Sequence, residues 1–166
     1  MFPEDIAAAA ERLLKELGVR RMVLATAESC TGGLIVAAMT EIAGSSSVVD
    51  RGFVTYSNEA KMELLDVPAE TIEQHGAVSQ QTALAMVAGA LAHSRADVAV
   101  AVTGIAGPGG GSADKPVGLV HIAAGRKGAP PHHRACRFGD IGRSSVREAT
   151  VREAFAMIRQ AISEGR

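Results

Sequence analysis

The chain has 166 residues, of which 47% are hydrophobic and 21% charged, with a formal net charge of −1, and these values are typical of one ordinary globular domain. Aromatic side chains make up only 3% of the chain, with no Trp and one Tyr, whereas alanine is abundant and there are 18 Gly, so we expect a core of small aliphatic side chains. A near-neutral charge and few aromatic rings argue against a general nucleic-acid-binding protein, which uses a basic face or stacking rings.

The sequence predicts neither a membrane span nor a secretory signal, and we expect a cytoplasmic protein. No apolar run approaches the roughly 18 residues that a spanning helix needs, and the N-terminal segment is acidic and amphipathic. Cys30 and Cys136 lack CxxC spacing, so we expect no disulfide. His132 and His133 adjoin, but neighbouring side chains on a strand point to opposite faces, so no metal site is predicted.

The first part of the chain has the pattern of alternating helices and strands. Pro3–Leu17 begins with acidic residues and is followed by Gly18, which predicts a helix that stops there. Met22–Ala27 is typical of a short buried strand. Thr31–Ile42 has apolar residues at helical spacing, and Gly52–Tyr56 is strand-like.

Capping residues mark three further helices. Asn58 is expected to cap one helix, Pro68 to open a short one, and Ser79 to cap a small, apolar helix that contains Thr82–His93. This alanine-rich helix could pack against a copy of itself or belong to the core of one chain, and both alternatives stay open.

The last part of the chain contains three predicted strands and a final helix. Asp97–Thr103 is a run of small and β-branched residues, as expected for a strand covered on both faces. Further strands are expected at Val117–Ala124 and Arg134–Phe138, and a helix at Val146–Ile162. Because no helix separates the last two strands, we expect them to be antiparallel. We predict an α/β fold over residues 1–166, a three-layer α/β/α sandwich with a mixed, mostly parallel sheet.

The first candidate site is Thr26–Gly33 (TAESCTGG), where a strand runs into a helix. This junction places Ser29 beside helix N–H groups that can stabilise an oxyanion or a phosphate. Alternatively, Ser29 or Thr31 only caps the helix and the glycines permit close packing. Cys30 could itself be a nucleophile or a small buried residue.

The second candidate site is Phe53–Lys61, which holds the single tyrosine of the chain, Tyr56. A desolvated lysine that loses its proton near neutral pH can activate a serine, and serine–lysine pairs are an established variant of the catalytic triad. Tyr56 could relay the proton or hold Lys61 in place. On the alternative interpretation, Lys61 is solvated and Tyr56 is an ordinary core ring.

Two further segments could bind anions. The glycine-rich Val102–Gly118 follows a strand, where backbone N–H groups can contact a phosphate or oxyanion, although it has neither the Walker A nor the GxGxxG spacing. An ordinary surface loop would explain these glycines almost as well. Arg143 and Arg147 are four residues apart at the start of the last helix, where they could clamp a phosphate or carboxylate or simply form a solvated face.

These motifs together resemble one family, the C-terminal domain of the competence/damage-inducible CinA proteins. TAESCTGG, GFVTYSNEAK, QHGAVS, VTGIAGPGGGSADKPVG and GRSSVR occur in the family's order and spacing, over about Thr26–Arg147. Stand-alone members are nicotinamide-nucleotide amidases. The resemblance therefore implies an enzyme that hydrolyses the carboxamide of nicotinamide mononucleotide to nicotinic acid mononucleotide and ammonia, in pyridine nucleotide salvage. Larger members carry an additional N-terminal domain, whose activities are not transferred to this chain.

The resemblance also implies residue roles. Ser29 looks like the nucleophile, Lys61 its general base and Tyr56 the assisting hydroxyl, without a metal or cofactor. The implied partners are a small-molecule substrate and further copies of the chain in a homo-oligomer. Candidate substrate-binding groups lie in or beside the motifs: Thr31, Gly32, Gly33, Ser79, Thr103, Gly104, Gly107 and Arg143.

An alternative hypothesis assigns the protein to a different functional class. On this hypothesis it is a non-catalytic nucleotide-binding or interaction module linked to competence or DNA damage. The presence of Ser29, Tyr56 and Lys61 together argues against it.

Overall fold

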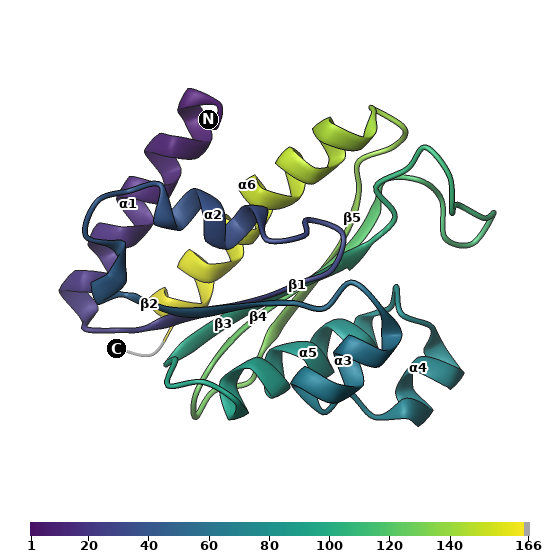
Figure 1. Cartoon of the computed structure of the whole chain (residues 1–166), viewed down its shortest axis with the longest axis horizontal. Coiled ribbons are helices and arrows are strands. Elements are labelled where there is room, and N and C mark those ends of the chain that lie inside the picture. Colours follow the sequence, from purple (N-terminus) through teal and green to yellow (C-terminus); the bar gives the residue numbers. More distant parts are fainter. Residues whose placement is uncertain (165–166) are drawn as a thin grey trace.

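The computed structural model describes residues 1–164 and has three layers, with a sheet between two layers of helices (Figure 1). The strands are β1 (Leu24–Glu28), β2 (Val49–Val54), β3 (Val98–Gly104), β4 (Leu119–Arg126) and β5 (His132–Arg137). The helices are α1 (Glu4–Arg20), α2 (Leu34–Thr40), α3 (Asn58–Leu65), α4 (Ala69–His75), α5 (Gln80–Ala92) and α6 (Arg143–Ser163), with a 3-10 turn η1 at Ser45–Ser47. Figure 1 shows α1, α2 and α6 on one face of the sheet and α3, α4 and α5 on the other.

The sheet has five strands in the order β2-β1-β3-β4-β5. β1 is parallel to both of its neighbours, β2 and β3, whereas β4 is antiparallel to β3 and β5. Only β4 therefore runs against the other strands, which confirms the predicted mixed, mostly parallel sheet and the antiparallel last pair. Glu28 at the end of β1 is level with Val54 of β2 and Val102 of β3, so the carboxyl ends of these three strands meet at one edge of the sheet.

Several predicted helix boundaries are wrong. The helix predicted at Thr31–Ile42 is shorter (Leu34–Thr40), and the one predicted at Val146–Ile162 is longer (Arg143–Ser163). α1 continues through Gly18 and ends at Arg20, because Arg21 adopts the left-handed conformation (φ 54°) and its N–H bonds back to Gly18 O. α3 is capped by Ser57 and not by Asn58: the Ser57 backbone is extended, and its hydroxyl accepts a hydrogen bond from an N–H of the first turn at 3.0 Å.

The cap predicted at Ser79 is confirmed, because its hydroxyl accepts the N–H of Thr82 at 3.1 Å. The strand predicted over Gly52–Tyr56 instead covers Val49–Val54. Thr55 makes one more bond to the sheet, from its N–H to Glu28 O, and the chain then leaves the sheet, so Tyr56 lies beyond the strand.

The core has two parts, one on each face of the sheet, and both are built from small side chains. Three valines of β3 point towards α1 and α6, whereas the intervening alanines point towards α5: Val98, Val100 and Val102 on one face, Ala99 and Ala101 on the other. Phe155 is the only aromatic ring among the buried core residues of the described chain. The predicted aliphatic core is confirmed.

α5 belongs to the core of the single chain. Its apolar residues pack on the alanine-lined face of the sheet, and only four positions are exposed: Gln80, Gln81, Ala88 and Ala92. Gly89 faces the end of α3, where a Cβ atom would lie 1.9 Å from the carbonyl oxygen of Leu65. The glycine therefore allows the two helices to approach closely.

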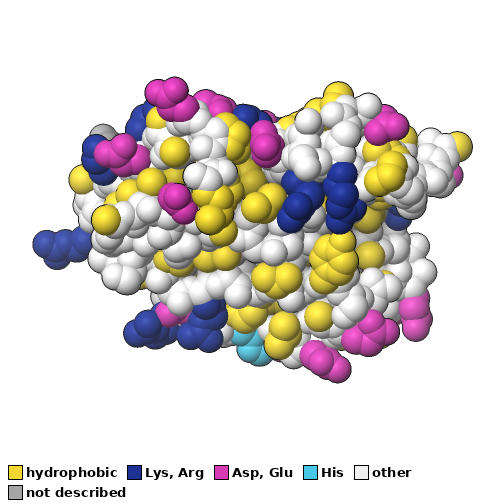
Figure 2. All heavy atoms as spheres, turned by 45° about the horizontal axis from the view of Figure 1, so that its top comes forward, with side chains coloured by type: hydrophobic (Ala, Val, Ile, Leu, Met, Phe, Trp, Pro, Cys, Tyr) yellow, Lys and Arg dark blue, Asp and Glu magenta, His cyan; other side chains and the backbone are white. Residues whose placement is uncertain are grey.

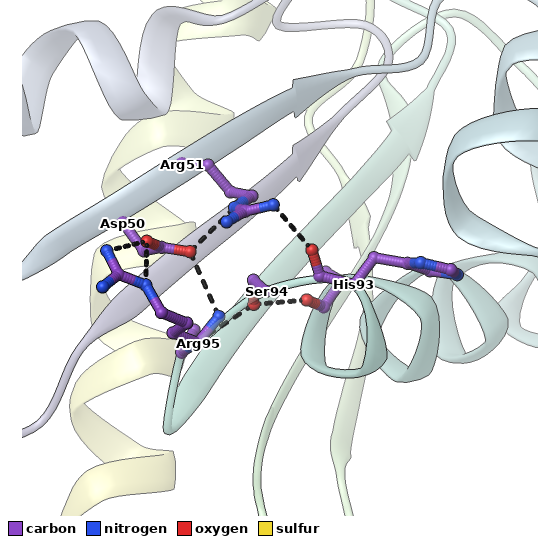
Figure 3. A network of polar contacts seen from close by, with 7 residues as sticks. Asp50, Arg51, His93, Ser94 and Arg95 are labelled. Atoms are coloured by element: carbon purple, nitrogen blue, oxygen red, sulfur yellow. Dashed lines mark hydrogen bonds and ion pairs between the residues drawn. The ribbon is translucent and has the colours of Figure 1, made fainter.

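The amino end of β2, remote from the strand ends that meet, is tied to the loop after α5 (Figure 3). The buried Asp50 carboxylate accepts hydrogen bonds from Arg95 Nη2 at 2.8 Å and from Arg51 Nε at 2.7 Å. Arg51 also donates to the carbonyl of His93 at 2.9 Å. The hydrogen bonds from Arg95, and then that from Arg51, lower the pKa of Asp50 to about 2, so this network stays charged near neutral pH.

On the face shown in Figure 2, acidic and basic side chains are interspersed, and hydrophobic side chains lie beside a small group of basic ones. None of the helices within residues 1–164 combines the length and the apolar character needed to cross a membrane.

Gly89→Ala should destabilise the protein, although Gly→Ala inside a helix normally stabilises by about 1 kcal/mol. The new methyl group would meet the Leu65 backbone, and overpacking of this kind costs about 1–3 kcal/mol. Gly18→Ala is the matched control, because Gly18 is also helical and has nothing within 4 Å of the Cβ position. Urea unfolding should give a lower midpoint for the first variant and an equal or higher midpoint for the second. Equal midpoints for Gly89→Ala and the wild type would contradict the packing argument.

Candidate active site

A cavity of about 220 Å³ opens where β1, β2 and β3 end. Ser29 follows β1, Lys61 lies on α3 after β2, and Thr103 and Gly104 end β3. The lining consists of Ser29, Cys30, Tyr56, Asn58, Lys61, Ala77, Val78, Thr103, Gly104, Ala106 and Arg143. Ligands of open α/β sheets bind beyond the carboxyl ends of the strands, and the cavity lies there.

The turn that carries Ser29 is anchored by Glu28, the last residue of β1. The Glu28 side chain is fully buried. Its carboxylate accepts five hydrogen bonds of 2.7 to 3.1 Å, from two hydroxyls and three backbone N–H groups: Thr26, Thr31, Gly33, Ile35 and Val36. The N–H groups belong to the start of α2, so Glu28 caps this helix and its negative charge faces the positive end of the helix dipole.

This arrangement corrects the predicted role of the α2 terminus, because Glu28 already uses the N–H groups that were expected to bind an oxyanion or phosphate. Thr31 is fully buried, and neither Gly32 nor Gly33 lines the cavity. The two glycines instead adopt positive φ angles of 59° and 100°, which the turn into α2 requires. Neither Ser29 nor Thr31 is the helix cap.

Lys61 and Ser29 are in direct contact. Lys61 Nζ lies 3.0 Å from Ser29 Oγ, 2.8 Å from the carbonyl oxygen of Thr55 and 3.4 Å from that of Ser57. Lys61 is only 1% exposed, and within residues 1–164 no carboxylate forms an ion pair with it. Burial lowers the pKa of Lys61 below its ordinary value of 10.5. The interpretation of Lys61 as a solvated helix residue is therefore wrong.

Three oxygen atoms surround Lys61 Nζ, and an ammonium can donate one hydrogen to each: Ser29 Oγ, Thr55 O and Ser57 O. In the neutral amine, the two carbonyl oxygens can accept the two remaining hydrogens, and the lone pair can accept the hydrogen of the Ser29 hydroxyl. This geometry allows Lys61 to act as a base towards Ser29.

Tyr56 lies at the mouth of the cavity and not beside the lysine. Its side chain is 64% exposed, so it is no core ring, and its hydroxyl accepts a hydrogen bond from Arg143 Nη2 at 2.9 Å. Within residues 1–164, this hydroxyl has no hydrogen bond to Lys61 or Ser29. Lys61 is held by the carbonyl groups on either side of Tyr56 instead, and the expectation that the Tyr56 hydroxyl holds the lysine is not met.

The Cys30 thiol is unsuited to act as a nucleophile. Cys30 is only 6% exposed, and its side chain belongs to the core on the α1 and α6 face. Burial raises the pKa of the Cys30 thiol to about 12, so it stays protonated near neutral pH. The alternative in which Cys30 is a small buried residue is confirmed.

The remaining predicted residues divide into two groups. Thr103 and Gly104 line the cavity, and the Thr103 hydroxyl donates to Ala77 O at 2.7 Å, which holds the segment before α5 against β3. Ser79 and Gly107 do not line it. Ser79 caps α5, and the Gly107 carbonyl accepts a hydrogen bond from Arg143 Nη1 at 2.8 Å.

The prediction from sequence missed Glu28 and four residues that line the cavity: Asn58, Ala77, Val78 and Ala106. A partial signal for Glu28 was available, because a carboxylate in the turn that leads into a helix can accept the free N–H groups at the helix start. Cavity-lining residues such as Asn58 and Ala106 gave no such signal, since their position depends on how three strand ends meet.

The adjacent histidines point in different directions, as expected for a strand. His133 Nε2 lies 2.9 Å from His121 Nδ1, whereas His132 pairs with Glu164 at 2.7 Å. Within residues 1–164, no three or more His, Cys, Asp or Glu side chains are grouped so that they could hold a metal ion.

The chain is similar to several known proteins. The nicotinamide-nucleotide amidohydrolase PncC of Escherichia coli K12 is 45% identical over 163 residues, which are 98% of this chain and 95% of that protein. The crystal structure of the competence/damage inducible protein CihA from Agrobacterium tumefaciens matches with a TM-score of 0.96 and 57% identity, and the match covers 98% of each chain.

Other relatives are longer. A CinA-like protein of Mycolicibacterium vanbaalenii is 51% identical over 142 residues, which are 86% of this chain and 33% of that protein. The chain spans about a third of the length of several such curated relatives. The profile of the CinA C-terminal domain matches residues 6–162. The chain therefore belongs to the CinA C-terminal domain family.

Proposed function

We propose that the protein hydrolyses the carboxamide of nicotinamide mononucleotide to nicotinic acid mononucleotide and ammonia, in pyridine nucleotide salvage, by a serine–lysine acyl-enzyme mechanism. The observation that carries this proposal is the 3.0 Å contact between Lys61 Nζ and Ser29 Oγ, made by a buried lysine that has no acidic partner among residues 1–164. The substrate class is supported by the name of the E. coli relative, which aligns with nearly the whole chain.

In the first half-reaction, neutral Lys61 accepts the hydroxyl proton of Ser29 while Ser29 Oγ bonds to the amide carbon. The C=O π electrons move to the oxygen and give a tetrahedral oxyanion. When this intermediate collapses, the C–N bond breaks, and the Lys61 ammonium returns the proton to the departing nitrogen. Ammonia leaves, and Ser29 carries the nicotinoyl group as an ester.

In the second half-reaction, Lys61 accepts a proton from water, whose oxygen attacks the ester carbon. The second tetrahedral intermediate releases Ser29 Oγ, which takes the proton back from Lys61, and nicotinic acid mononucleotide leaves as the acid, whose carboxyl proton is then lost to the solvent. The residues therefore end as they began, and the sum is one amide and one water converted to one acid and one ammonia.

Arg143 is the proposed contact for the phosphate. Its guanidinium lines the cavity and donates to the Tyr56 hydroxyl and to the Gly107 carbonyl. Within residues 1–164 it has no acidic partner, and it retains further N–H groups that can bind phosphate oxygens. Tyr56 then acts at the cavity mouth by holding Arg143 rather than by moving a proton.

Ser29→Ala and Lys61→Met should each lower ammonia release from nicotinamide mononucleotide by about 10³-fold or more, because one variant removes the nucleophile and the other its base. A coupled ammonia assay on the purified proteins measures this. Cys30→Ala is the matched control beside Ser29, and it should retain most of the activity. An active Ser29→Ala enzyme would contradict the mechanism, and tight nucleotide binding by a wild type that releases no ammonia would favour a binding module.

The pH profile tests the protonation state of Lys61. Because burial lowers the pKa of this amine and only its neutral form accepts the Ser29 proton, kcat/KM should rise with pH and level off below pH 10.5. Rates are measured in buffers of constant ionic strength over the range in which the fold is intact. A rate that still rises tenfold per pH unit at pH 10 would mean that Lys61 titrates as an ordinary solvated lysine.

Arg143→Met should remove the preference for a phosphorylated substrate. Ammonia release is compared between the mononucleotide, its riboside and free nicotinamide. A charge-assisted hydrogen bond contributes about 1.5–3 kcal/mol, so kcat/KM for the mononucleotide should fall about tenfold to hundredfold. The value for the riboside should change little. An equal loss for both substrates would show that Arg143 does not bind the phosphate.

A further inference from the structure

Arg147 lies one helical turn after Arg143 on α6, but the structure separates the two guanidinium groups. Arg143 reaches the cavity, whereas Arg147 is directed at the turn that follows Ser29. Arg147 Nη2 donates to the carbonyl oxygen of Thr31 at 2.8 Å, and Nε donates to that of Cys30 at 3.2 Å. The neighbouring Glu148 pairs with Arg152 instead, at 3.6 Å.

These contacts continue through the backbone towards the nucleophile. The C=O and N–H of a trans peptide point in opposite directions, so the Thr31 carbonyl that faces Arg147 directs the N–H of Gly32 away from it. That N–H donates to the carbonyl oxygen of Ser29 at 3.0 Å. The Ser29 carbonyl belongs to the peptide whose N–H is that of Cys30, and this N–H points away from Gly32 in turn.

The N–H of Cys30 ends this chain of peptide groups. Within residues 1–164 no other residue accepts a hydrogen bond from it, and Cys30 lines the cavity although its thiol is buried in the core. The residue after a nucleophile commonly supplies an oxyanion-hole donor from its backbone. Hydrogen bonds in series polarise one another, so a cation at one end strengthens the donor at the other.

We propose that Arg147 is a positioning residue that orients and polarises the N–H of Cys30 as the oxyanion donor of the Ser29 reaction. This inference rests on the proposed function. Arg147 acts through two peptide groups and contacts no substrate, so its contribution appears when negative charge develops on the carboxamide oxygen and not when the substrate binds.

The position of Arg147 also decides against the alternative of a two-arginine clamp for a phosphate. Two of its N–H groups are engaged by backbone carbonyls, and it does not line the cavity. Arg143 and Arg147 lie on one helix, as their four-residue spacing predicts, but their guanidinium groups contact different neighbours.

Arg147→Met and Arg147→Lys test the proposal. Loss of one oxyanion-hole donor lowers kcat about 10²–10³-fold. In Arg147→Met the donor, the N–H of Cys30, remains and loses only the arginine that orients it. We therefore expect a smaller fall in kcat, of about tenfold to hundredfold. KM should stay within about threefold of the wild type. Arg147→Lys keeps the charge without the two-point geometry and should recover part of the loss. Arg159→Met is the control. Arg159 also lies on α6 but bonds to Glu16 of α1, so this variant should leave kcat unchanged.

A second measurement needs no amide substrate. Pyridine-3-boronic acid forms a tetrahedral adduct with a nucleophilic serine and mimics the charged intermediate. Its inhibition constant is measured by competition with a substrate that the enzyme hydrolyses. If no such substrate is found, the dissociation constant is measured by calorimetry. For Arg147→Met this constant should rise by about the factor by which kcat falls, whereas mononucleotide binding to Ser29→Ala should be unaffected by adding Arg147→Met.

Each outcome separates the two proposals. If the wild type releases no ammonia from the mononucleotide yet binds the boronic acid more tightly than Arg147→Met does, the proposed substrate fails and the role of Arg147 stands. An unchanged boronic acid constant in Arg147→Met overturns the role of Arg147, as does a rise in KM alone. If Arg147→Met does not fold, an unchanged constant in folded Arg147→Lys likewise overturns it.

Discussion

The buried carboxylate of Glu28 is the interaction on which the site depends. Removing a carboxylate from water is costly unless hydrogen bonds replace the lost solvation, and Glu28 accepts five of them. Its partners come from β1, from the turn and from the first turn of α2. The same set of bonds therefore fixes the end of the strand, the start of the helix and the direction in which Ser29 leaves the sheet.

Opposite charges hold this turn from two sides. Glu28 accepts hydrogen bonds from backbone N–H groups at the start of α2, whereas Arg147 donates hydrogen bonds to the carbonyl groups of Cys30 and Thr31. Lys61 differs from both, because it is buried among oxygen atoms that carry no full charge and, within residues 1–164, has no ionic partner. A site of this kind combines two charged groups that act on the backbone with one buried amine, and burial lowers the pKa of that amine.

The scarcity of aromatic residues has consequences for both the core and the cavity. With alanines on the sheet face below α5 and a glycine facing Leu65, the helices pack closely without large rings. The cavity has a single aromatic side chain, Tyr56, and it lies at the mouth. On the proposed function, the pyridine ring would therefore be held by backbone groups and small side chains as much as by stacking.

The sequence by itself determined the fold class, the order of the elements and the cap at Ser79, because these follow from hydrophobic periodicity and from local capping. Its resemblance to the CinA C-terminal domain family also pointed to Ser29 and Lys61. Only the tertiary structure decided the contacts of Tyr56 and Arg147. Tyr56 bonds to Arg143, and Arg147 bonds to the backbone of the turn after Ser29. These partners are 87 and 117 residues apart in the chain, whereas periodicity and spacing record only local neighbours. The Glu28 bonds are local, but they depend on how the turn folds back over the carboxylate.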